Sequence, residues 1–259
     1  MGIGLAAAKR IAALGAHVTV FARHRQPLER AVAEITAARK QPQQEIGYRL
    51  LDVADHAQVQ TVMRDTVSEL GAPRVLLNCA GRAYPRRFED ISYEQFEETM
   101  RVNLHGTWST IQALVPHMKA QGGYIVNTSS IAGLIGVFGY TDYSASKFAL
   151  IGFSEALRSE LKPLGIRVSV LCPPDTDTPG FAVENQTKPL ETKAISASAK
   201  VMSADAVAAA LLRGMQRSQF LIIPGWDGKL GVLAKRLAPW LVEKVVDRTV
   251  AQVARRQTK

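Results

Sequence analysis

The chain has 259 residues, of which 47% are hydrophobic and 21% are charged, a globular composition that excludes a disordered or fibrous chain. Lys and Arg outnumber Asp and Glu by 32 to 23, which gives a formal net charge of +9. Residues 229–259 hold eight of the basic and two of the acidic side chains, a net +6, so the rest of the chain is only mildly basic.

The two cysteines, Cys79 and Cys172, lie inside apolar runs. They are too few for a disulfide framework, and their surroundings lack the Cys/His spacing of a metal site. No run reaches the roughly 18 apolar residues of a membrane-spanning helix, and the N-terminus lacks a basic segment followed by an apolar signal core. We therefore expect a reducing, cytoplasmic location and no bound metal.

Apolar runs of strand length alternate with stretches of helical periodicity along most of the chain, which predicts repeated strand–helix units around a parallel sheet. The predicted helices cover residues 3–14, 27–39, 56–70, 93–119, 142–162 and 204–216. The predicted strands cover residues 17–22, 47–53, 75–79, 124–128, 166–172 and 220–223. The pattern indicates an α/β, doubly wound Rossmann fold over residues 1–228, followed by a basic amphipathic helical tail over residues 229–259.

One feature departs from a complete fold of this class. A doubly wound domain begins with a strand at the centre of its sheet, whereas this chain opens with Met1-Gly2-Ile3-Gly4 and passes directly into a helix. We expect the sheet to lack its first strand and the native chain to extend upstream by roughly 10 to 20 residues, the length of a strand and a turn. Without that strand, the chain is expected to be unstable and to bind cofactor poorly.

The opening Gly2-Ile3-Gly4 is similar to the end of a phosphate-binding glycine loop, in which the backbone approaches a pyrophosphate at a helix N-terminus. A simple helix start explains the same two glycines. After the predicted strand 17–22, Arg23 and Arg25 stand where an NAD site places an acid. A cation there can pair with a 2′-phosphate and favours NADP, although a solvated basic turn remains the alternative.

Two further strand ends carry candidate cofactor contacts. Asp52 and Val53 follow the predicted second strand, where they could meet the adenine, or Asp52 could instead take part in capping the next helix near Asp55. The sequence Asn78-Cys79-Ala80-Gly81 closes the third strand with small residues. These leave room for a ligand in the crevice of the sheet, and a tight strand exit is the equal alternative.

The most informative group is Ser130, Tyr143 and Lys147. Tyr143 and Lys147 are four residues apart, so on a helix they share one face and the ammonium lies near the phenol. A nearby cation favours the phenolate, which allows the tyrosine to act as an acid on a ketone oxygen while a hydride arrives at carbon. Ser130 lies thirteen residues before Tyr143 and can hydrogen-bond the same oxygen.

Taken together, these motifs resemble the short-chain dehydrogenase/reductase family from Gly2 to about Ile223. The resemblance implies that Tyr143 is the acid/base and that Ser130 orients the carbonyl. It also implies that Lys147 binds the nicotinamide ribose and lowers the pKa of Tyr143. Asn103, in Met100-Arg101-Val102-Asn103, would hold the water of a proton relay.

A closer resemblance, to the 3-ketodihydrosphingosine reductases, begins after the predicted strand 166–172. It rests on the run Pro173-Pro174-Asp175-Thr176-Asp177-Thr178-Pro179-Gly180-Phe181, its continuation to Thr192, and Gly133 to Tyr140. It implies NADPH-dependent reduction of the 3-keto group of a long-chain sphingoid base, with Pro173, Thr176 and Thr178 near the cofactor. Prolines and threonines also build a structural turn, which is the alternative.

Three expectations concern partners. The tail carries Leu233 and Leu237 and, beyond Pro239, valines at helical spacing among basic residues. This pattern predicts a helix at an anionic membrane surface or, as the alternative, a helix packed on the domain or at a subunit interface. The family resemblance implies a homo-oligomer. The alternative functions are reduction of another lipid-like ketone, such as a 3-oxoacyl, steroid or retinoid, and, remotely, a non-catalytic membrane or nucleic-acid binding module; no nucleic-acid partner is expected.

Overall fold

The computed structural model describes residues 1–197 and 199–257, so Thr258 and Lys259 of the predicted tail lie outside the described residues. The helices are α1 (Gly2–Ala13), α2 (Arg25–Ala38), α3 (His56–Leu70), α4 (Tyr93–Met100), α5 (Gly106–Met118), α6 (Thr141–Leu161), α7 (Pro179–Thr187), α8 (Leu190–Ser196), α9 (Ala204–Gln216), α10 (Trp226–Leu237) and α11 (Pro239–Gln257). The strands are β1 (Val18–Ala22), β2 (Ile46–Leu50), β3 (Val75–Asn78), β4 (Gly123–Thr128), β5 (Ile166–Leu171), β6 (Thr176–Asp177), β7 (Met202–Ser203) and β8 (Leu221–Ile222).

The main strands are parallel but form two separate sheets. One has the order β3-β4-β5-β8 and the other is the pair β1-β2, with Val18 opposite Ile46 and Ala22 opposite Leu50. Within the described residues, β1 and β3 pair with no strand on the sides that would join these sheets. Their residues are mostly half-buried, whereas β4 and β5 are mainly buried. The predicted break at the centre of the sheet is thus confirmed.

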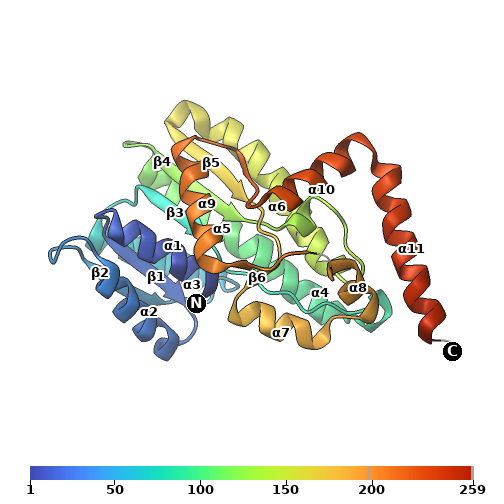
Figure 1. Cartoon of the computed structure of the whole chain (residues 1–259). Coiled ribbons are helices and arrows are strands. Elements are labelled where there is room, and N and C mark those ends of the chain that lie inside the picture. Colours follow the sequence, from blue (N-terminus) through green and yellow to red (C-terminus); the bar gives the residue numbers. More distant parts are fainter. Residues whose placement is uncertain (198, 258–259) are drawn as a thin grey trace.

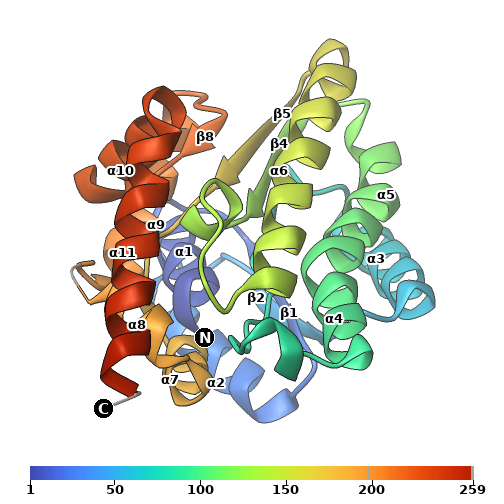
Figure 2. The ribbon, with the colours of Figure 1, turned by 90° about the vertical axis from the view of Figure 1, so that its right-hand side faces the viewer.

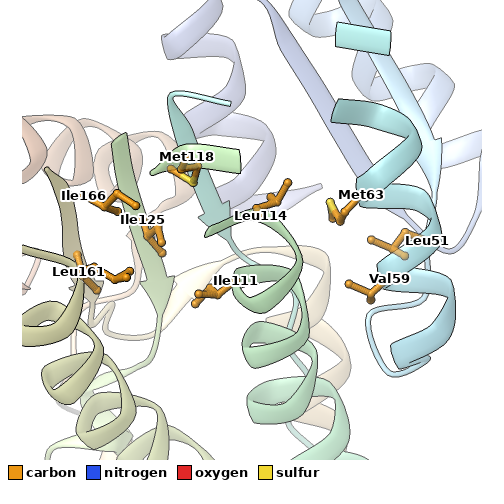
Figure 3. Packing of buried hydrophobic residues seen from close by; sticks show 10 residues of the cluster. Leu51, Val59, Met63, Ile111, Leu114, Met118, Ile125, Leu161 and Ile166 are labelled. Atoms are coloured by element: carbon orange, nitrogen blue, oxygen red, sulfur yellow. The ribbon is translucent and has the colours of Figure 1, made fainter. Parts of the chain in front are cut away.

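Helices cover both faces of the strands (Figure 1). On one side, α3 and α5 pack together over the sheet, and their apolar side chains join those of β4, β5 and α6 in the largest core cluster (Figure 3). On the other side, α1 packs against α2 and α9, and Ala7, Val207 and Leu211 meet Leu171 and Val126. Burial on both faces explains the nearly continuous apolar runs of β4 and β5.

Two parts of the fold differ from the sequence expectation. The helix expected over residues 93–119 is divided into α4 and α5 by one π-helical turn, Arg101–His105. Between β6 and β7 the chain forms the short helices α7 and α8, which hydrophobic periodicity does not reveal. The first correction matters for the site because π-helical turns displace backbone groups and are frequent at functional positions.

The C-terminal part forms α10 and α11, divided at Pro239 as expected. Helix α11 runs beside α8 along one flank of the molecule, as Figures 1 and 2 show from two directions. In the part of the chain that the structure describes, no helix has the length and apolar character needed to cross a membrane.

Candidate active site

The carboxyl ends of the parallel strands bring the predicted site residues to one edge of the fold. Ser130 follows β4, Gly81 follows β3, and Thr178 follows β5 and the short β6. Helix α6 supplies Tyr143 and Lys147 from its first two turns. This edge is where open α/β sheets bind their ligands, so the topology alone places these residues at a binding crevice.

Tyr143, Ser130 and Lys147 meet as predicted. The Ser130 hydroxyl is hydrogen bonded to the Tyr143 side chain. The Nζ atom of Lys147 lies 5.5 Å from the centre of the Tyr143 ring and donates a hydrogen bond to the Thr128 oxygen at 2.8 Å. The lysine is therefore held over the ring by the end of β4, within reach of a ligand that enters the crevice.

Burial dominates the acid–base properties of this group. It raises the pKa of Tyr143, the charge of Glu184 raises it further, and the hydrogen bond from Ser130 opposes them. The resemblance implies that Lys147 lowers this pKa, but in the structure the pKa of Tyr143 is raised, because a buried phenolate loses hydration. Burial also lowers the pKa of Lys147 to about 8.

Asn103 lies in the π-helical turn and is fully buried. Its Nδ2 donates to the Arg82 oxygen and to Ser146 Oγ, both at 3.0 Å, and its Oδ1 accepts from the Arg82 nitrogen at 2.8 Å. The side chain thus fixes the loop after β3. Gly81 stands between Asn103 and Lys147, since a Cβ there would lie 3.4 Å from Asn103 Oδ1 and from Lys147 Nζ. The water-holding role of Asn103 stays a prediction.

The start of α1 forms a cradle that suits a dinucleotide. Gly2 has a φ of +61°, and a Cβ on it would lie 3.0 Å from Thr178 Cγ2. A Cβ on Gly4 would lie 3.2 Å from Cys79 Cβ. With Ile3 between them, these glycines let the helix start approach the ends of β3 and β6, where free backbone N–H groups attract phosphate. The residues present therefore fit a nicotinamide dinucleotide.

The two arginines after β1 point to different surroundings. Arg23 is exposed and lies close to Arg82, whose pKa is lowered by burial and, to a smaller extent, by the charge of Arg23. Arg25 donates from Nη1 to the Tyr48 hydroxyl at 3.3 Å, at the flank of β2. Arg23 thus lies on the crevice side of β1, whereas Arg25 does not.

The candidates at the ends of β2 and β3 have local partners. Asp52 Oδ1 accepts from the Ala54 nitrogen at 3.0 Å, while Asp55 caps α3. Val53 packs closely against the start of α5. Asn78 donates to Asn127 Oδ1 at 3.0 Å and accepts from Thr110 at 2.8 Å. These side chains already serve the fold, and contact with a cofactor stays a prediction for them, as for Ala80.

The loop after β5 is partly a structural turn. The Pro173 oxygen accepts a hydrogen bond from the Ile131 nitrogen at 3.1 Å, and Thr176 Oγ1 donates to the Pro174 oxygen at 2.7 Å. Thr178 caps α7 by accepting from the Phe181 nitrogen at 3.1 Å, and its methyl group faces Gly2. Of the loop residues predicted to contact the cofactor, Thr178 thus has the position nearest the cradle.

A charged group beside Tyr143 was not assigned from sequence. Lys188 Nζ lies 3.1 Å from Glu184 Oε1 and 3.4 Å from Asp175 Oδ2. Tyr140 donates its hydroxyl proton to Glu184 Oε1, and its ring centre lies 5.5 Å from that of Tyr143. We call Asp175, Glu184 and Lys188 the α7 charge cluster. The spacing of Glu184 and Lys188, four residues apart, is the only sequence signal for it.

An apolar groove opens on the neighbouring side of α6. It has a volume of about 570 Å³ and lies between the loop before α6 and α11. Its lining residues are Gly136, Val137, Phe138, Thr141, Ser144, Val246, Asp247, Val250 and Ala251. Val246 and Val250 of the predicted amphipathic stripe therefore face inward, toward this groove. Their position favours the alternative in which the tail helix packs on the rest of the protein.

The exposed apolar side chains of the tail lie on α10 and at the start of α11. They are Trp226, Leu230, Leu233, Leu237, Trp240, Leu241 and Val245. The four on α10 are spaced by four, three and four residues and so share one helical face. Lys229 lies over the Trp226 ring at 5.0 Å. We call the surface that Trp226, Leu230, Leu233 and Leu237 form with Lys229 the α10 face. It combines aromatic, aliphatic and cationic groups.

Comparison with known proteins agrees with this geometry. The sequence model of the family described as short chain dehydrogenase matches residues 1–189. A 3-ketodihydrosphingosine reductase from Bos taurus is 40% identical over 92% of this chain and 73% of its own. A 3-dehydrosphinganine reductase from Danio rerio is 41% identical over 88% of this chain and 69% of its own.

Solved structures show the same fold. A short chain dehydrogenase/reductase from Burkholderia phymatum in complex with NAD has a TM-score of 0.80 at 25% identity, over 93% of this chain and 91% of its own. An alcohol dehydrogenase from Thermococcus sibiricus complexed with 5-hydroxy-NADP has a TM-score of 0.71 at 25% identity, over 86% and 91% of the two chains. The chain belongs to the short-chain dehydrogenase/reductase family of nicotinamide-dependent oxidoreductases.

Proposed function

We propose that this protein uses NADPH to reduce the 3-keto group of 3-ketodihydrosphingosine to the 3-hydroxyl of dihydrosphingosine. The observation that carries the reaction type is the meeting of Tyr143, Ser130 and Lys147 at the crevice. The assignment of the substrate rests on the reductases from Bos taurus and Danio rerio, which are named for this ketone. A sphingoid ketone also suits a protein in which α6, the helix that carries Tyr143, lines an apolar groove.

The chain's own residues account for the proton. Ser130 donates a hydrogen bond to the carbonyl oxygen and so orients the ketone beside the Tyr143 hydroxyl. Tyr143 gives its proton to that oxygen as negative charge develops there. Its high pKa keeps it protonated at neutral pH before the reaction. Lys147, with its ammonium near the ring, stabilises the phenolate that remains until a proton returns from solvent.

The cofactor is held by the cradle and by Arg23. NADPH supplies the hydride that reduces the carbonyl carbon. Gly2, Gly4 and Thr178 line the place for its pyrophosphate, and Arg23 provides a cation for the 2′-phosphate. The preference for NADPH over NADH rests on this one exposed guanidinium.

The alkyl chain of the substrate has a place in the apolar groove. Thr141 and Ser144 join this groove to the helix that carries Tyr143, and Val246 and Val250 close it from α11. The buried Ser144 hydroxyl has no hydrogen-bond partner among the described residues. An apolar ligand in this groove would lose contact with water along most of its length, which supplies binding energy in proportion to the area covered.

The α10 face is the basis for the location that we propose for this protein. A cytoplasmic protein that binds a membrane surface through this face would meet a lipid substrate where the lipid resides. Tryptophans and lysines beside leucines are typical of helices that lie in the interface of an anionic membrane. We place this face, rather than the valines of α11, against the membrane because Leu233 and Leu237 are exposed and Val246 is not.

The exposed aromatic residues of α5 and α6 favour self-association. Trp108 on α5 and Phe148 on α6 are each 46% exposed. Tryptophan and phenylalanine are enriched where protein subunits contact one another. We therefore propose a homo-oligomer that pairs through α5 and α6.

The proposed activity is tested by NADPH oxidation with 3-ketodihydrosphingosine in detergent, with the product identified by mass spectrometry. Dihydrosphingosine should form in proportion to the NADPH consumed. Turnover of a 3-oxoacyl thioester, a steroid or a retinoid ketone at higher kcat/KM would replace the sphingoid ketone as substrate.

A further inference from the structure

Beside Tyr143 the fold places two carboxylates and one ammonium in a largely buried position. The side chain of Lys188 is 3% exposed, that of Glu184 is 17% exposed and that of Asp175 is 29% exposed. Lys188 also lies 4.4 Å from the centre of the Phe181 ring, which screens it from water. One cation between two anions leaves the α7 charge cluster with a net charge of −1.

This excess negative charge acts against the catalytic group. Both Glu184 and Asp175 raise the pKa of Tyr143, so they disfavour the phenolate that forms when Tyr143 gives up its proton. Burial raises the pKa of Glu184 as well, which means that its charge is incompletely compensated by Tyr140 and Lys188. A cation bound near Glu184 would remove both penalties.

The free surface of Glu184 shows where such a cation would bind. Its Oε1 accepts from Tyr140 and faces Lys188, whereas no hydrogen bond to Oε2 occurs among the described residues. Tyr140, which stacks near Tyr143, connects this carboxylate directly with the catalytic ring. Glu184 therefore offers one carboxylate oxygen at a position that is linked to the Tyr143 ring through Tyr140.

We infer that Glu184, assisted by Asp175, binds the ammonium group on the carbon next to the ketone of the substrate. This inference rests on the proposed function, because 3-ketodihydrosphingosine carries its ammonium at C2, directly beside the carbonyl at C3. The carboxylate then determines specificity: it selects an amino ketone over a plain long-chain ketone. Binding of the substrate also neutralises the cluster at the moment when Tyr143 must lose its proton.

The test compares two substrates in two proteins. The substrates are 3-ketodihydrosphingosine and the analogue in which hydrogen replaces the C2 ammonium. The wild type should show at least about a tenfold higher kcat/KM with the amino ketone, and Glu184→Gln should lose most of that preference. Its kcat/KM should fall for the amino ketone, which loses its anionic partner, and rise or hold for the analogue, because the charge that disfavours the Tyr143 phenolate is gone. Glutamine keeps the shape and an acceptor for Tyr140, so the change removes the charge alone.

A binding measurement and a control separate this role from a structural one. Dihydrosphingosine should bind more weakly to Glu184→Gln than to the wild type, whereas the alcohol without the amine should bind both equally. Glu191→Gln is the matched control, since Glu191 is a buried carboxylate on α8 that pairs with Arg87. It should leave the substrate preference unchanged.

Each outcome decides the inference. An equal loss of kcat/KM on both ketones in Glu184→Gln would show a structural role and overturn it. Should Glu184→Gln fail to fold, the inference is tested by Asp175→Asn and by the preference of the wild type for the amino ketone. A wild type without that preference would overturn the inference. Absence of turnover on both ketones would instead overturn the proposed function, and this inference with it.

Discussion

Lys147 donates a hydrogen bond to the main-chain oxygen of Thr128 at 2.8 Å while its side chain is almost fully buried. No carboxylate among the described residues forms an ion pair with it. A buried ammonium with one neutral acceptor is costly, which is why its pKa is lowered to about 8. The active site therefore keeps a charge that is useful for chemistry and unfavourable for stability.

Replacement of Lys147 should stabilise the cofactor-free protein. Because folding lowers the lysine pKa from 10.5 to about 8, the unfolded chain binds more protons between these values, and the Lys147 contribution to unfolding free energy rises with pH there. Below pH 8 the folded protein bears the full free-energy cost of burying the charged Lys147 side chain. Lys147→Met should thus be more stable than the wild type by about 3 kcal/mol at pH 7 and should lose activity. Urea unfolding at pH 7 and 10 measures this; a less stable variant at pH 7 would contradict it.

Tyr143 should be needed for proton transfer and not for binding. In Tyr143→Phe the ring that packs against Tyr140 remains and the acidic proton is lost. We expect kcat to fall by about 10² to 10⁴-fold, the usual value of a general acid, with NADPH affinity nearly unchanged. Stopped-flow hydride transfer and cofactor fluorescence measure the two quantities. Unchanged kcat in the variant would remove Tyr143 from the mechanism.

Arg23 should set the cofactor preference. Arg23→Ala removes the cation at the crevice side of β1, so the ratio of kcat/KM for NADPH to that for NADH should fall about tenfold. Arg25→Ala is the matched control, because Arg25 donates to Tyr48 instead. A larger fall in the control than in Arg23→Ala would reassign the 2′-phosphate site.

The apolar groove between α6 and α11 should determine which alkyl-chain lengths of the substrate the protein accepts. Val250→Trp fills the groove beside Ser144, so kcat/KM should fall about tenfold for the long-chain ketone and little for a short-chain one. Val245→Trp introduces the same ring at an exposed position of α11 and should change neither value. Equal losses on long and short ketones would show that the groove does not hold the alkyl chain.

The α10 face should carry membrane binding. The double variant Leu233→Ser and Leu237→Ser should sediment less with vesicles containing anionic lipid, because it removes two exposed apolar side chains from that face. Leu70→Ser removes a leucine of similar exposure from α3 and serves as control. Sedimentation of the double variant equal to that of the wild type would exclude this face.

The sequence predicts much of the sheet because β4 and β5 are buried on both faces and therefore read as apolar runs. The break between α4 and α5 could not be read in the same way. The turn contains Asn103, whose hydrogen bonds reach Arg82 and Ser146 from other parts of the chain. Periodicity reports local burial and carries no record of such tertiary contacts.

The proposed catalytic pair is predictable from the sequence for a different reason. Tyr143 and Lys147 are linked by helical spacing, so a local pattern implies their contact. The contact of Glu184 with Tyr140 joins residues 44 positions apart. Helix α7, which presents Glu184, buries no residue fully and so lacks a clear apolar stripe. A charge pair on such a helix resembles any solvated pair until the fold is known.

Hydride transfer is followed most directly with NADPH that carries deuterium at both C4 positions, using the wild-type protein and 3-ketodihydrosphingosine. We expect dihydrosphingosine with one deuterium at C3, and about 10²- to 10⁴-fold slower formation of that product in a parallel reaction with Tyr143→Phe. Unlabelled product, or label transferred only to ketones without the C2 amine, would contradict the proposed function.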